Sequence, residues 1–194
     1  MNWQTKKLGE ICDFDGGSQP PKSNFIFTPR NSYVRFLQIR DFKNSKNITY
    51  IPESKKNRLC NKDDILIGRY GASVGQILTG EEGAYNVALM KTIPDLSILD
   101  RSFFYLYLIS SEFQDRLLKV SARSAQAGFS KEDIYNFPVI TPPLAEQHRI
   151  VKILDEVFEK IVKAKENAEK NLQNSKQLFA SYLESVFNKK GNGW

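Results

Sequence analysis

The chain has 194 residues, enough for one ordinary domain with an appendage or for two small domains, and its 41% hydrophobic and 26% charged residues exclude a disordered chain. The net charge of +6 favours a polyanionic partner without requiring one. Two cysteines, one histidine and no long apolar run exclude a disulfide framework, a four-ligand zinc site and a membrane span, so we expect a cytoplasmic protein without a metal or a membrane partner.

Four segments in the first part of the chain are predicted to form strands. They carry alternating or continuous apolar residues and are separated by Gly, Pro, Asn and Asp. The glycines at 68, 71 and 75 indicate tight turning or a close approach of backbone segments. The predicted strands cover residues 33–40, 64–70, 74–78 and 85–93, the last of them ended by Pro94.

Two helices are predicted to follow these strands. Asp100 or Ser102 is a suitable N-cap for a helix that runs to about Lys119. Ser130 and Asp133 have the spacing of a capping box and indicate a short helix that Pro138 closes. Residues 1–143 are therefore predicted to form a mixed α+β, strand-rich domain.

A long helix is predicted over residues 144–190, which contain no Gly or Pro. Apolar residues recur at the alternating steps of four and three that mark a coiled-coil seam, with one stutter. At 1.5 Å per residue the helix would be roughly 65 Å long, too long to bury its apolar stripe against a 140-residue domain alone. It therefore needs a partner helix, from another copy or from another part of a longer chain. The predicted interface residues are Ile150, Leu154, Val157, Ile161, Leu172, Phe179, Tyr182 and Val186.

Two further possibilities concern the C-terminal part of the chain. One is that the predicted helix folds back into a two-helix hairpin, which is disfavoured because only Asn171 or Asn174 offers a turn. Residues 191–194 (Gly-Asn-Gly-Trp) echo Asn2-Trp3, so they are either the start of a second repeat unit or a chance similarity.

Sequence motifs of the common DNA enzymes are absent. The chain has no Asp-Pro-Pro-Tyr-like loop for adenine methylation, no Gly-rich turn for a methyl donor and no phosphate-binding loop for ATP. No carboxylate cluster has nuclease spacing, and His148 has no nucleophile beside it in the sequence. We therefore predict no catalytic residue and no cofactor.

Two segments have the composition of a DNA-binding surface. Residues 18–70 carry eleven Lys or Arg against four acids, a local charge of +7, with amides and hydroxyls interleaved. Cations neutralise phosphates, whereas Arg, Gln and Asn can also pair with base edges. Residues 121–130 are small, polar and basic, and they lead into a helix N-terminus. A solvated basic surface and an ordinary loop are the respective alternatives.

The order of several short motifs resembles the specificity subunit of type I restriction–modification enzymes. They are Trp3 with Leu8-Gly9-Glu10-Ile11, Gly16-Gly17-Ser18, Asp64-Ile65-Leu66-Ile67-Gly68-Arg69-Tyr70-Gly71 with Gly75, Gly128-Phe129-Ser130 with Ile134, and Pro142-Pro143-Leu144-Ala145-Glu146-Gln147 with Ile150-Val151. The last motif, opening a long helix, is the most specific, and the match spans nearly the whole chain.

The resemblance implies a non-catalytic subunit that recognises double-stranded DNA. In this family two target recognition domains are each followed by a long helix, and the helices pair antiparallel, so that each domain reads half of a split site. The expected partners are methyltransferase (modification) subunits and, in the full complex, the restriction subunit. Because this chain has one unit of each kind, it is either a fragment of a tandem subunit or a natural half that forms a homodimer through the helix.

From the basic segments we predict a set of DNA-facing residues, while Gly71 and Gly75 are expected to shape their loop. The alternative function is a coiled-coil scaffold with only non-specific DNA affinity, and no helix-turn-helix pattern supports a transcriptional regulator. The predicted DNA-facing residues are Lys22, Arg35, Gln38, Arg40, Arg69, Tyr70, Arg123, Ser124 and Gln126.

Overall fold

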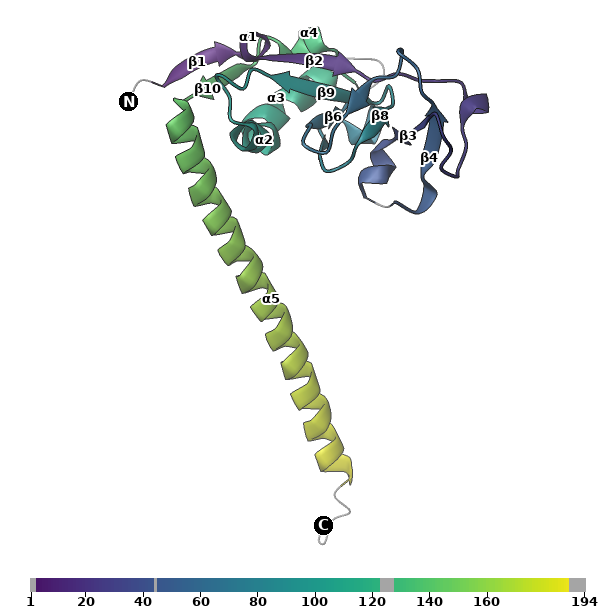
Figure 1. The fold of residues 1–194 in the computed structure, drawn as a ribbon. Coiled ribbons are helices and arrows are strands. Elements are labelled where there is room, and N and C mark those ends of the chain that lie inside the picture. Colours follow the sequence, from purple (N-terminus) through teal and green to yellow (C-terminus); the bar gives the residue numbers. More distant parts are fainter. Residues whose placement is uncertain (1–2, 44, 123–127, 189–194) are drawn as a thin grey trace, which may run out of the picture. The chain divides into compact units, whose positions relative to one another are not determined.

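The structure, a computed structural model, describes residues 3–43, 45–122 and 128–188 (Figure 1). The chain divides into a first unit, up to His148, and a second unit from Arg149 onward. None of the helices in the described ranges is long and apolar enough to cross a membrane. The division between the two units falls inside the last helix, which begins at Leu144, and the predicted domain boundary at 143/144 stays a prediction.

The first unit is mixed α+β, as the sequence predicts. Its helices are α1 (Leu8–Ile11), α2 (Arg101–Ile109), α3 (Ser111–Ser121) and α4 (Lys131–Ile134). Short 3₁₀ turns lie at Lys22–Asn24, Ile39–Phe42, Ser45–Asn47 and Gly71–Ser73. Its strands are β1 (Gln4–Lys7), β2 (Cys12–Gly16), β3 (Tyr33–Leu37), β4 (Thr49–Pro52), β5 (Leu59–Cys60), β6 (Leu66–Gly68), β7 (Ile77–Leu78), β8 (Gly83–Tyr85), β9 (Leu89–Pro94) and β10 (Pro138–Thr141).

The strands form two four-stranded sheets and one pair. The first sheet has the order β2-β9-β6-β7 and is antiparallel throughout. The second has the order β4-β3-β8-β5, in which β3 and β8 are parallel. Strands β1 and β10 pair antiparallel, at the opposite end of the unit from β3 and β4 (Figure 1).

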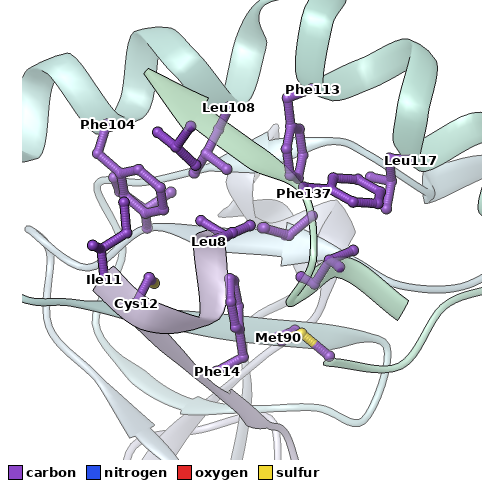
Figure 2. Packing of buried hydrophobic residues seen from close by; sticks show 14 of the residues in the cluster. Leu8, Ile11, Cys12, Phe14, Met90, Phe104, Leu108, Phe113, Leu117 and Phe137 are labelled. Carbon is purple, nitrogen blue, oxygen red and sulfur yellow. The ribbon is translucent and has the colours of Figure 1, made fainter. Parts of the chain in front are cut away.

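Successive residues of the central strands face different cores, because side chains alternate between the two faces of a strand. In β6, Ile67 packs into the main cluster, with α1, α2 and α3, whereas Leu66 packs into a second cluster with residues of the other sheet. In β3, Leu37 belongs to that second cluster and Phe36 to a third. Figure 2 shows the main cluster, where the rings of Phe113 and Phe137 meet edge to face at 5.9 Å.

Two elements differ from the prediction. The helix expected from about 101 to 119 is two helices, because Ser110 is extended (φ −67°, ψ 153°) and its hydroxyl oxygen accepts from the backbone N–H of Phe113, which caps α3. The strand expected over 85–93 is split between the sheets: Tyr85 ends β8 and Leu89 begins β9. The predicted N-cap at Asp100 and the capping box of Ser130 and Asp133 are confirmed.

The long helix is confirmed as α5 (Leu144–Asn188), a continuous helix of 45 residues, so the hairpin alternative is wrong. From Val157 onward, the predicted interface residues are exposed in the single chain, from 43% for Val157 to 66% for Tyr182. Their pairing stays a prediction. Residues 191–194, the proposed start of a second unit, lie outside the described residues.

Candidate nucleic-acid interface

Residues 16–52, which include β3 and β4, contain a single carboxylate, Asp41. That carboxylate is buried, with its side chain 1% exposed. The backbone N–H of Gln38 donates to its Oδ2 (2.7 Å), and Nε of Arg40 lies 3.8 Å from its Oδ1. Burial raises the pKa of Asp41 because it disfavours the charged form. The exposed charge contributed by this stretch is therefore positive.

Cations of the stretch lie on the turns around β3 and β4. Lys22 is in the first 3₁₀ turn and Arg40 in the second, and both are exposed. Gln38, half-buried, directly precedes Arg40's turn. Arg30, Lys43 and Lys46 are exposed as well. Figure 1 shows β3 and β4 at one end of the first unit, with these segments beside them. We call residues 16–52 the basic face.

Arg35, also predicted to face DNA, is committed to an internal ion pair. Its Nη1 donates to Oε2 of Glu81, and both side chains are only 22% exposed. Its Nε and Nη2 are buried without a hydrogen-bond partner among the described residues. Because the Glu81 carboxylate already pairs with this guanidinium, and removing its charge would leave Glu81 half-buried and unpaired, we leave Arg35 out of the proposed interface.

Arg69 and Tyr70, two more of the predicted DNA-facing residues, contact each other just after the end of β6. The Arg69 guanidinium lies 5.0 Å from the centroid of the Tyr70 ring, and its Nε donates to the Phe129 carbonyl (3.3 Å). A Cβ on Gly16 would lie 3.0 Å from Nη1 of Arg69, which places this arginine against the start of the basic face. Tyr70 is 44% exposed.

Gly128 and Phe129 belong to the second predicted segment, residues 121–130, of which residues 123–127 lie outside the described residues. Arg123, Ser124 and Gln126 are among residues 123–127, so their placement stays a prediction. Gly128 forms an antiparallel bridge with Tyr70. Gly71 and Gly75 have positive φ values of 59° and 80°, which suit glycine and agree with a role in shaping the adjacent loop.

Sequence reasoning does not single out Arg30, Lys43 and Lys46. They belong to the basic stretch, but the sequence does not indicate on which surface of the fold an isolated basic residue will lie. The signal in the sequence is that residues 16–52 contain only one acidic residue. This signal points to a surface only when the pairing of β3 with β4 is known, because that pairing folds the stretch back on itself.

Comparison with known proteins identifies a family for most of the chain. The family model described as "Type I restriction modification DNA specificity domain" matches residues 1–172. The MjaVIII specificity subunit of Methanocaldococcus jannaschii is 21% identical over 80% of this chain, and the EcoDI specificity subunit of Escherichia coli is 31% identical over 34%.

Solved structures share the fold. A chain from a type I restriction–modification system has a TM-score of 0.74 over 95% of this chain, at 24% identity. The HsdS subunit of Thermoanaerobacter tengcongensis has a TM-score of 0.67 over 84%, at 26% identity. This chain spans 36% of the MjaVIII subunit, and 45% and 39% of the two structures' chains. By the match over residues 1–172, the chain belongs to the family of type I restriction–modification DNA specificity domains.

Proposed function

We propose that this chain reads the base sequence of one half of a split site in double-stranded DNA and that the basic face binds the duplex. The observation that carries the proposal is that residues 16–52 expose cations on several turns, while their single carboxylate is buried. Exposed lysines and arginines bind phosphates, and amides such as Gln38 can pair with base edges. A uniform positive surface also avoids repelling the polyanion.

We assign no chemistry to the chain and propose that partner subunits perform it. In this account the chain docks methyltransferase subunits, which methylate the DNA, and the restriction subunit in the full complex. Membership in a family of specificity domains supports this division of labour. Methylation of a base inside a duplex also requires extrusion of that base, for which a separate enzyme with its own pocket is suited.

We further propose that α5 pairs antiparallel with a second long helix and sets the spacing between half-sites. Val157, Ile161, Leu172 and Phe179 follow the predicted seam and are 43–64% exposed in the single chain. Burying this stripe supplies the stability that a paired helix needs. The partner helix comes either from a second copy or from a second unit of a longer chain, and this chain spans less than half the length of the MjaVIII subunit and of the solved structures it resembles.

Selection of duplexes from a random pool, followed by sequencing, tests this function. The purified chain is mixed with the pool in the presence of the cognate methyltransferase subunit. A short motif repeated in inverted order across a fixed gap supports a dimer of identical units, because a twofold axis requires an inverted repeat. A motif without its inverted mate supports one unit of a tandem subunit. Binding without any enriched motif contradicts sequence recognition and favours a coiled-coil scaffold with non-specific DNA affinity.

A further inference from the structure

We propose that Phe27 is a base-contacting residue of the basic face: an apolar side chain that enters a groove of the duplex and contacts bases there. The inference rests on the proposed function and adds a specificity determinant to it. It depends on three observations, which concern the exposure of the Phe27 ring, the rigidity of its segment and the charges around it.

The Phe27 ring is unusually exposed. Among the large apolar side chains in the described part of the first unit it has the highest exposure, 72%, followed by Ile140 at 56%. Phe25, two residues earlier, packs instead against the third cluster, with its ring 5.3 Å from that of Phe36. The segment therefore packs one phenylalanine, partly buried, against the core and leaves the next one in solvent.

The backbone around Phe27 is held in place at both ends and in the middle. Ile26 and Tyr50 exchange two backbone hydrogen bonds, of 3.0 and 2.8 Å, which attach the segment to β4. Upstream, the backbone N–H of Ser18 donates to the Tyr85 carbonyl (3.1 Å). Downstream, the N–H of Glu53 donates to the Ser32 carbonyl (2.9 Å). Because the backbone that carries the ring is already held, contact with a ligand requires little ordering of the backbone.

The surroundings of Phe27 match DNA better than they match an apolar protein surface. Phe27 belongs to the basic face, and in the sequence it lies between the exposed Lys22 and Arg30. The antiparallel bridge of Ile26 with Tyr50 brings Phe27 to the end of β4 that follows the turn carrying Lys46. Exposed cations in the same segment as a protruding apolar ring fit a duplex, in which an apolar side chain contacts a thymine methyl group or wedges between base pairs.

Affinity measurements on a matched set of variants test the assignment. The variants are Phe27→Ala, Phe27→Leu and, as the control, Leu96→Ala, which truncates a 52% exposed side chain outside the basic face. The probes are a duplex enriched from the random pool by the wild-type chain and the unselected pool itself. Thermal unfolding midpoints should agree among all four proteins, because both positions are exposed.

We expect Phe27→Ala to weaken binding to the enriched duplex by about 5- to 100-fold, the range expected when one base–aromatic interaction is removed. Binding to the unselected pool should change by less than about twofold, since phosphate contacts carry no sequence information. Phe27→Leu should retain most of the preference, and Leu96→Ala all of it. Deoxyuridine in place of thymidine identifies a methyl contact, and permanganate-reactive thymines that disappear with Phe27→Ala identify a wedge.

Two results would overturn the assignment, and they differ in what they say about the proposed function. If the wild-type chain enriches a motif and Phe27→Ala keeps the full preference, Phe27 does not contact bases, while sequence recognition by the chain stands. If the wild-type chain enriches no motif, the proposed function fails and the role of Phe27 fails with it.

Discussion

Gln147 donates a hydrogen bond from Nε2 to the carbonyl of Ile98 (2.8 Å), although 49 residues separate them in the sequence. Nε2 also donates to the Pro142 carbonyl, and Oε1 accepts from the N–H of Asp100, both at 2.8 Å. Gln147 is completely buried, and its amide satisfies three polar backbone groups around it. This arrangement explains why a glutamine ends the motif at 142–147: it fixes the first turn of α5 to the N-terminus of α2.

Gln147→Leu keeps the size of the side chain and removes its hydrogen bonds. We expect the free energy of unfolding to fall by about 3 kcal/mol, because three backbone groups at this site lose their hydrogen-bond partners. The unfolding midpoint should fall by roughly 6–12 °C for a unit of this size. Gln173→Leu, at an exposed position of α5, is the control and should leave the midpoint unchanged. Equal midpoints for Gln147→Leu and the wild-type chain would show that the amide network does not hold the fold.

Much of the fold follows from local signals. Asp100 and the pair Ser130 and Asp133 predict helix starts because capping depends on neighbouring residues only. The break at Ser110 is harder to predict because no Gly or Pro marks it, although a serine followed by Glu112 in the next turn is an N-cap signal. The division of β8 from β9 could not be predicted, since it depends on which sheet each strand joins.

Charge changes on the basic face should weaken DNA binding in a salt-dependent way. For Lys22→Ala and Arg40→Ala we expect weaker binding of all duplexes and a decrease of about 1 in the slope of log K against log salt for each phosphate that the variant no longer neutralises. Titrations of a labelled duplex at several salt concentrations measure both quantities. Lys170→Ala, at an exposed position of α5, matches the charge change and should leave the slope unaltered. An identical effect of all three variants would mean that only the net charge matters.

Both cysteines should be unreactive in the folded chain. Cys12 and Cys60 are free and buried, and burial raises the pKa of their thiols to about 12 and about 11. At pH 8 we expect both thiols to react slowly with a disulfide reagent in the native chain and rapidly in denaturant. The unfolded thiols ionise near pH 9, below the folded pKa values, so the free energy of unfolding should fall as the pH rises from about 9 to 11. Rapid labelling of two thiols in the native chain at pH 8 would contradict this burial.

Pairing of α5 should be sensitive to a charge on its seam. Ile161→Asp places a carboxylate at a predicted interface position and should abolish association, because the charge would be buried against the partner helix. Sedimentation measures the change, and Lys160→Asp, at a neighbouring exposed position, is the control that should still associate. Persistent dimers of Ile161→Asp would exclude this seam, and a wild-type chain that stays monomeric would favour a partner helix within a longer chain.

The candidate interface was harder to predict than the fold. Composition located the basic stretch, but the local sequence does not show that Arg35 points to Glu81, 46 residues away. It also does not show that Asp41 is withdrawn from the surface, or that Phe25 is partly buried against the third cluster while Phe27 is exposed. These distinctions arise from the sheet formed by β3, β4 and β8, whose pairing is long-range.

Hydrogen exchange of the chain, with and without a duplex enriched from the random pool, tests the central claim most directly. Backbone amides that DNA covers exchange more slowly, so the measurement maps the interface without substitutions. We predict new protection at residues 18–32 and 38–48 of the basic face, with little change in α2. Protection confined to α2 and α3, with the basic face unchanged, would contradict DNA binding by the basic face.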